Sequence, residues 1–122
     1  MEIFRPTIVL FALAALGDLT VAAASVPAQE PSDVSVGKAI YDLHCQKCHG
    51  ASGRGDGPQA QWQMVAPANF HSRTSQMKSD EQLLSIITWG IFFSPMHSWG
   101  DRLSLKEREE VLAYVRFLAQ RN

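Results

Sequence analysis

The sequence predicts a small all-α domain of three to four helices, and three observations carry this prediction. Ser79 with Gln82, and Ser104 with Glu107, each fit the capping box that marks the start of a helix. Apolar residues after the second of these starts recur at spacings of three and four, as one face of a helix requires. No stretch gives a convincing alternation of apolar and polar residues, as a half-buried strand would. The 122 residues of the chain suffice for one domain.

Residues 1–28 are predicted to be a secretory signal peptide. A short basic start precedes an apolar run at 7–17, and small residues follow it, which is the order typical of export signals. Cleavage is expected after Ala28, with Ala24 as the second choice. An uncleaved membrane anchor is the alternative. A membrane-spanning helix needs about 20 apolar residues, however, and Asp18 interrupts the run.

Residues 29–122 would then form the mature domain, exported to a bacterial periplasm and not stably inserted in the membrane. The whole chain has a formal net charge of −1 and 46% hydrophobic residues, which is ordinary for a globular protein. This balance gives no reason to expect a nucleic-acid partner or an anionic membrane surface. A domain of this size has a limited core and usually needs a disulfide, a metal or a cofactor.

The first helix of the mature domain is expected to begin at Ser35, which can cap it. Ile40, Tyr41 and Cys45 follow at helical spacings. Gly37 costs about 1 kcal/mol relative to alanine inside a helix. A residue this small lets another helix approach closely.

Cys45 and Cys48 are the two cysteines of the chain, and His49 follows directly. A disulfide between them would close a ring too small to stabilise the fold much. A thioredoxin-like pair opens a helix within a strand–helix fold, and a zinc ion would need four crowded ligands including His44. The pattern C-x-x-C-H signals covalent haem attachment. Two thiols can reach two vinyl groups on one porphyrin edge, and quasi-helical backbone brings His49 under the iron.

A long loop from Gly50 to Lys78 separates the first helix from the second. Loops of this length in small domains are usually functional, and here we expect the loop to wrap one edge of the haem. Its glycine-rich segment at 53–58 indicates a tight turn.

The second helix should begin at Ser79 and end at Gly90, and the last should begin at Ser104. Each has an apolar face: Leu83, Leu84, Ile86 and Ile87 in the second helix, and Val111, Tyr114, Val115 and Leu118 in the last. The opposite side of the last helix is expected to face solvent, with Arg108, Glu109 and Arg116.

Four segments, taken in order, resemble the class I c-type cytochromes over about Val34 to Leu118. They are CQKCHG (45–50), GRGDGP (53–58), SPMHSWG (94–100) and LSLKEREEVLAYVRFL (103–118). The resemblance implies a small cytochrome c-like fold wrapped around one covalently bound haem. It also implies that the first helix crosses the last, with Gly37 and Tyr41 against Tyr114.

The same resemblance implies a haem c bound through thioethers at Cys45 and Cys48, with His49 and Met96 as axial iron ligands. Met96 lies between the second and last helices, where the family places its ligand methionine. The family often has Met-Pro there, whereas this chain has Pro95-Met96-His97, so His97 is a competing candidate. A His/Met pair closes the iron site and suits electron transfer.

Residues around the haem are predicted as well. The resemblance nominates the carbonyl of Pro58 as acceptor for the His49 ring, with Ala66-Pro67 as a competing placement. Met64 and Met77 are expected to be core fillers. Haem-packing or core positions are expected for Trp62, Trp89, Phe92, Phe93 and Trp99.

Together these features predict a monohaem c-type cytochrome that carries single electrons between redox protein partners and is not an enzyme. One alternative is a haem subunit of a larger oxidoreductase complex. Another is a ligand-sensing or catalytic haem protein with a labile sixth ligand.

Overall fold

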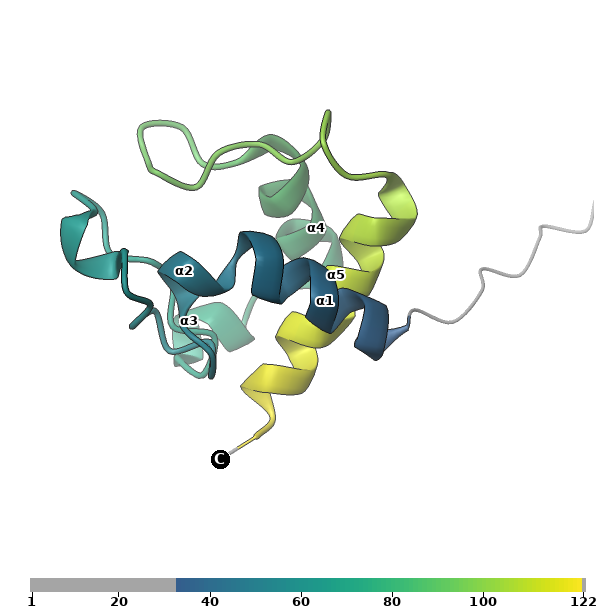
Figure 1. Cartoon of the computed structure of the whole chain (residues 1–122), viewed down its shortest axis with the longest axis horizontal. Coiled ribbons are helices and arrows are strands. Elements are labelled where there is room, and N and C mark those ends of the chain that lie inside the picture. The colour runs from purple at the N-terminus through teal and green to yellow at the C-terminus, as the bar shows by residue number, and fades with distance from the viewer. Residues whose placement is uncertain (1–32, 122) are drawn as a thin grey trace, which may run out of the picture.

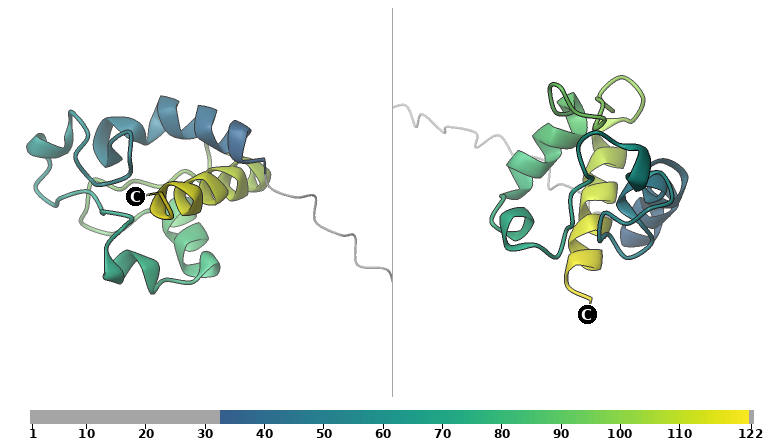
Figure 2. Two further views of the ribbon diagram at one scale, coloured as in Figure 1. Left: turned by 90° about the horizontal axis from the view of Figure 1, so that it is seen from below. Right: turned by 90° about the vertical axis from the view of Figure 1, so that its left-hand side faces the viewer.

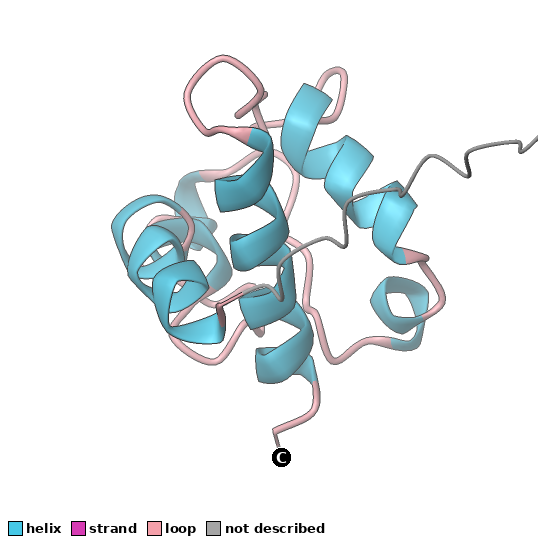
Figure 3. Cartoon of the chain, turned by 90° about the vertical axis from the view of Figure 1, so that its right-hand side faces the viewer, coloured by secondary structure: helices cyan, strands magenta, loops and turns pink. Residues whose placement is uncertain are grey.

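The computed structural model describes residues 33–121, and within this range the chain is helical with no strand (Figure 1, Figure 3). The predicted all-α class is therefore confirmed. The predicted signal peptide at residues 1–28, with its cleavage after Ala28 or Ala24, lies outside the described residues. Among the helices of the described range, none is long and apolar enough to cross a membrane.

Longer helices form the frame, and short helical turns lie between them. The longer ones are α1 (Val34–His44), α4 (Asp80–Trp89) and α5 (Leu105–Ala119). The short ones are α2 (Gln46–His49), the 3-10 turn η1 (Ala60–Trp62) and α3 (Arg73–Gln76). Figure 2 shows α5 between α1 and α4, and it packs against both.

The N-terminus of α1 corrects one sequence prediction. Asp33 caps the helix in place of Ser35, because its carboxylate accepts hydrogen bonds from the backbone N–H of Ser35 at 2.8 Å and of Val36 at 3.4 Å. Hydrogen bonding to Ser35 lowers the pKa of Asp33 from its usual value. An anion at this end also suits the helix dipole. Ser35 thus lies inside the first turn.

The crossing of α1 over α5 is tight, and it confirms the prediction for Gly37. A Cβ at Gly37 would overlap the carbonyl oxygen of Glu110, so only glycine fits there. One turn later, the ring of Tyr41 meets that of Tyr114 edge-on, with centroids 5.2 Å apart. The buried core cluster consists of Tyr41, Val111, Tyr114 and Leu118.

Both predicted capping boxes are present, at Ser79 with Gln82 and at Ser104 with Glu107. Gly90 ends α4 as expected, with a φ of 73°. In the sequence, α4 therefore ends before the segment that carries Met96, and α5 begins after it.

The face of α5 predicted to be solvated is partly buried, which is a second correction. Arg116 donates from Nε to Asp80 at 2.8 Å and from Nη2 to the carbonyl of Lys78 at 2.6 Å. It therefore ties α5 to the beginning of α4. Arg108 is half-buried and approaches Gly100. The charge pattern of one helix could not show that α4 and the segment before α5 cover this side.

The long loop folds back along α2. The amides of Gly55 and Gly57 donate to the carbonyls of His49 at 2.8 Å and Cys48 at 3.1 Å. These bonds hold the glycine-rich segment against the backbone of the C-x-x-C-H motif, as a tight turn. The loop then runs through η1, at the left of Figure 1, and through α3, below α2, to reach α4.

Candidate cofactor-binding site

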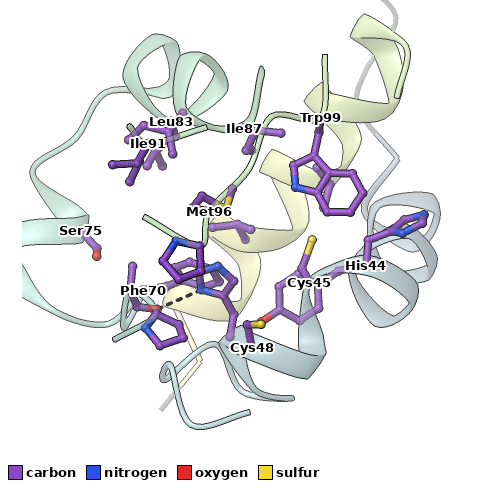
Figure 4. A pocket seen from close by; sticks show the side chains of 18 of the residues that line it. His44, Cys45, Cys48, Phe70, Ser75, Leu83, Ile87, Ile91, Met96 and Trp99 are labelled. Atoms are coloured by element: carbon purple, nitrogen blue, oxygen red, sulfur yellow. Dashed lines mark hydrogen bonds between the residues drawn. The ribbon is translucent and has the colours of Figure 1, made fainter. Parts of the chain in front are cut away.

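A cavity of about 510 Å³ lies between the helices, and its lining is largely apolar. All of the predicted site residues line it: Cys45, Cys48, His49 and Met96. Figure 4 shows the two cysteines on one side of the cavity and Leu83 and Ile91 on the other. Residues far apart in the sequence thus converge on one cavity.

The cysteine pair is presented by a nearly continuous helical backbone from α1 into α2. The amide of Cys45 donates to Tyr41 at 2.8 Å, and the amides of Cys48 and His49 donate to Cys45 at 3.1 and 2.9 Å. This is the quasi-helical path predicted for the motif. Both thiols are free, and burial, with a smaller contribution from neighbouring Cys48, raises the pKa of Cys45 to about 12.

The zinc interpretation of this motif gains no support from its geometry. Within residues 33–121, no group of three or more His, Cys, Asp or Glu side chains is placed to hold a metal ion. His44 instead packs against Trp99, with ring centroids 4.9 Å apart.

The His49 ring is fixed by a backbone carbonyl and an aromatic neighbour. Its Nδ1 lies 3.2 Å from the carbonyl oxygen of Ala68, and its ring stacks on Phe70 with centroids 4.8 Å apart. A carbonyl only accepts, so Nδ1 carries a proton, and in the neutral ring Nε2 then keeps its lone pair. Burial lowers the pKa of His49, although the bond to Ala68 opposes this, and the lowered pKa favours the neutral ring. A neutral imidazole of this tautomer can bind a metal through Nε2.

The acceptor of this bond is a third correction, because Pro58 does not provide it. Gln59, next to Pro58, donates to the carbonyl of Lys47 at 2.8 Å, which holds this segment along α2. The Pro58 carbonyl accepts instead from Gln61 at 3.5 Å. The competing nomination, Ala66-Pro67, is also wrong, but by one residue, because the carbonyl that accepts from the His49 ring belongs to Ala68.

Met96 is held in a short loop anchored to the end of α4. Its carbonyl accepts from Ile91 at 2.8 Å, and its amide donates to the hydroxyl of Ser94 at 3.0 Å. A Cβ at Gly90 would clash with the Met96 carbonyl, so glycine is required at this turn. Trp99 closes the loop by donating from its amide to Ile87 at 3.0 Å. The loop thereby holds the Met96 side chain in the cavity lining (Figure 4).

His97, the competing candidate, also lines the cavity but is more exposed than Met96. Its ring packs against Trp99 with centroids 4.5 Å apart, and its Nδ1 lies 3.1 Å from the carbonyl of Ser98. Met96 is half-buried. The geometry therefore favours Met96 as the side chain that faces a bound group.

The predicted walls of the cavity are partly wrong. Trp99 is buried and lines the cavity, as expected. The other predicted wall or core residues are exposed: Trp62, Met64, Met77, Trp89, Phe92 and Phe93. The walls come instead from the apolar faces of α4 and α5, among them Leu83, Ile87, Val111, Leu112 and Val115. Helical periodicity could have identified most of these; nothing in the sequence singles out Phe70 or Ala68.

The residues present fit a covalently attached haem. A flat apolar macrocycle needs apolar walls, which the cavity provides. The free thiols of Cys45 and Cys48 line it, as does an imidazole whose Nε2 lone pair is available. The thioether of Met96 comes from a different element of the lining.

Comparisons with known proteins agree with this fit. The Cytochrome c family profile matches residues 34–119. A chain of the Kuenenia stuttgartiensis reducing HAO-like protein complex is 37% identical with a TM-score of 0.64, and the match covers 71% of this chain and 44% of that one. Cytochrome c6 from the diatom Phaeodactylum tricornutum is 25% identical with a TM-score of 0.53, covering 72% and 95%.

A further structure, the KustC0563 c-type cytochrome, shares the fold at 24% identity and a TM-score of 0.56, covering 69% of this chain and 98% of that one. No match of comparable significance is found among curated proteins. The chain spans less than half the length of the first structure, the chain from the HAO-like complex.

Proposed function

This chain belongs to the cytochrome c family, and we propose that it carries single electrons between redox partner proteins in a bacterial periplasm. Its cofactor is one haem c, bound covalently. The observation that carries the proposal is that a histidine and a methionine, from different elements, line the apolar cavity that the cysteine pair also lines, and that the histidine ring is oriented by the Ala68 carbonyl. Such a ligand pair closes the iron site and suits electron transfer rather than catalysis.

Four side chains would hold the haem. Cys45 and Cys48 would form its thioethers, and His49 Nε2 and the Met96 sulfur would be its axial ligands. When bound, the haem supplies an iron that alternates between Fe(III) and Fe(II).

The chain itself orients the two iron ligands and provides apolar walls for the haem. The Ala68 carbonyl fixes the orientation and tautomer of the His49 ring, as such partners of metal-bound histidines do. The bonds of Ile91 and Ser94 to Met96 hold the second ligand in place. The apolar walls exclude water, which with a methionine ligand favours a higher reduction potential. A ligand set that stays fixed in both oxidation states keeps structural change during electron transfer small.

A second candidate is a haem subunit of a larger oxidoreductase complex. The 37% identity to a chain of the reducing HAO-like protein complex supports it. In that role the chain would still pass single electrons, but within a stable assembly.

The periplasmic location rests on the predicted signal peptide at residues 1–28. N-terminal sequencing of the haem-loaded protein from cells would test it, with a mature start after Ala28 expected. Recovery of intact Met1 in the membrane fraction would overturn it.

The function is tested by the optical spectrum of the dithionite-reduced protein, before and after addition of carbon monoxide. We expect a low-spin c-type spectrum that carbon monoxide leaves unchanged. Met96→Ala should bind carbon monoxide promptly, whereas His97→Ala and the exposed control Met64→Ala should behave like the parent.

Three outcomes would contradict the proposal in different ways. Prompt binding of carbon monoxide by the parent would indicate a labile sixth ligand, as in a sensor or catalyst. An opened site in His97→Ala alone would move the ligand to that residue. Loss of haem on acid–acetone extraction would exclude covalent attachment.

A further inference from the structure

Large apolar side chains stand exposed on two loops that border the cavity. One is the part of the long loop that includes η1 and ends at residue 66. The other follows α4 and runs from Gly90 to Pro95. We call their exposed apolar residues the apolar rim: Trp62, Met64, Val65, Ile91, Phe92 and Phe93. Val65 and Ile91 also line the cavity, so the rim is continuous with it. Both loops project from the same side of the molecule (Figure 1, Figure 2).

The two loops carry no formal charge. Residues 57–72 contain no Asp, Glu, Lys or Arg, and neither do residues 82–100, with histidine counted as neutral. The charged residues of the cavity lining, Lys47, Lys78 and Arg116, belong to other segments. The two loops that form the rim are therefore uncharged, in a chain in which 19% of the residues are charged.

Packing among residues 33–121 does not explain the two phenylalanines. Phe92 is 86% exposed and Phe93 is 92% exposed, and their rings contact each other with centroids 4.3 Å apart. Phe93 also has a φ of 59°, a left-handed conformation that is unfavourable for a bulky residue. Strain of this kind tends to occur at functional sites. An exposed aromatic side chain held at such a position points to a contact outside the chain.

We propose that the apolar rim is the docking surface for a redox partner whose own docking face is apolar and uncharged. The inference rests on the proposed function, because a partner must approach the cavity to exchange electrons with the group held there. Absence of charge on both loops argues against a strongly charged partner, which would lose hydration without gaining ion pairs. Burial of the aromatic side chains would drive association. Transient redox contacts of this kind are small, at less than about 1,200 Å².

This surface makes a specific prediction about salt. Electrostatic steering accelerates association strongly at low ionic strength and is screened at high ionic strength. Docking through an uncharged rim lacks electrostatic steering, so the rate of association should be nearly independent of ionic strength.

The test uses a second copy of the haem-loaded protein as the probe, since an uncharged apolar face is complementary to itself. One electron passes from the reduced copy to the oxidised copy, and the rate of this self-exchange is measured by NMR line broadening. In Phe92→Ser/Phe93→Asn the rate should fall by about tenfold or more, because burial of one aromatic side chain is worth at least that factor. The parent rate should stay nearly constant as salt is raised.

The matched control is Leu105→Ser, which removes an exposed apolar side chain that lies on α5, outside both rim loops and outside the cavity lining. It should leave the self-exchange rate unchanged. Spectra and reduction potentials of both variants should match the parent, so that a lower rate reports docking rather than a damaged haem site.

Either of two kinetic results would overturn the inference. One is a self-exchange rate of the double variant that equals the rate of the parent. The other is a steep fall of the parent's self-exchange rate as salt is raised. A stable dimer in sedimentation would assign the rim to self-association. Flotation of the parent, but not the double variant, with phosphatidylcholine vesicles would assign it to lipid. If haem is retained and the iron site is closed to carbon monoxide, any of these leaves the proposed function standing.

Discussion

The crossing of α1 over α5 and the apolar rim are both rich in aromatic residues, yet they use them in opposite ways. At the crossing, Tyr41 is fully buried, packs edge-on against Tyr114 and donates its hydroxyl to Gly50 at 2.7 Å. At the rim, Phe92 and Phe93 are exposed, and Phe93 has a left-handed backbone. The fold alone explains the first set of residues. Packing among the described residues does not explain the second set, which we assign to partner docking, so the two regions should respond differently to substitution.

The largest effect is expected at the crossing, for Gly37→Ala. The new methyl group would overlap the carbonyl of Glu110, and backbone cannot move aside as a flexible side chain can. We expect the free energy of unfolding to fall by about 3 kcal/mol or more, near the upper end for overpacked sites. Denaturant unfolding of the haem-loaded protein would measure it.

Ala39→Val is the control, because it enlarges an exposed position of the same helix. It should cost less than about 1 kcal/mol, which is the range of helix propensities. Equal losses in the two variants would mean that the helices can separate without penalty, and the comparison between tight crossing and open rim would fail.

The next effect is expected for Tyr41→Phe, which keeps the ring but removes the hydroxyl. The carbonyl of Gly50 would lose its buried donor, and an unpaired buried group costs about 1–3 kcal/mol. Thermal unfolding at neutral pH should show the loss. Tyr114→Phe is the matched control, because it removes the hydroxyl of the other buried tyrosine at the same crossing.

The cost of Tyr41→Phe should also depend on pH. Burial raises the pKa of Tyr41 above its ordinary value of 10.0. As the pH rises through 10, the unfolded chain releases the phenol proton while the folded chain retains it, so the parent loses stability. The phenylalanine variant lacks this loss. The stability difference between them should therefore shrink above pH 10, and a constant difference would contradict the assigned cause.

A smaller effect is expected for Ser104→Ala at the start of α5. The serine hydroxyl accepts from the amide of Glu107 at 3.3 Å, and the glutamate accepts from the amide of Ser104 at 2.7 Å. Loss of such a cap costs about 1 kcal/mol. Ser85→Ala, at an exposed position inside α4, should change the unfolding free energy by less than about 0.5 kcal/mol. If both variants unfold alike, the capping box does not define the start of α5.

Most of the helical frame could be predicted because its signals are local. The two capping boxes and the apolar stripes of α4 and α5 involve residues within one or two turns of each other. The start of α1 was placed slightly late because Ser35 and Asp33 are both good caps, and only the backbone path shows which one accepts hydrogen bonds. Burial of Arg116 was missed because its partners, Asp80 and Lys78, belong to another element.

The candidate site likewise has some residues that local sequence identifies and others that only the folded loops determine. Cys45, Cys48 and His49 form a continuous motif. Met96 could be nominated because the resemblance to the class I c-type cytochromes implies a ligand methionine between the second and last helices. The carbonyl that orients His49 could not be read from the sequence, because it depends on how a loop of nearly thirty residues folds back. Phe92 and Phe93 were assigned to the cavity wall by residue type, but their exposure depends on the tight loop that holds Met96.

The smallest effect should be found at the rim, and its sign should be reversed. Phe93→Asn replaces a bulky residue with one that tolerates a φ of 59°, and little packing is lost because Phe93 is exposed. We expect the free energy of unfolding to rise by less than about 1 kcal/mol, while Phe92→Ser should stay within about 0.5 kcal/mol of the parent. Thermal unfolding of the haem-loaded variants is the measurement. A loss of 2 kcal/mol or more, roughly the value of a buried aromatic side chain, would show that Phe93 supports the fold. The rim would then resemble the crossing, whereas a gain would mean that this position is kept for contact at the expense of stability.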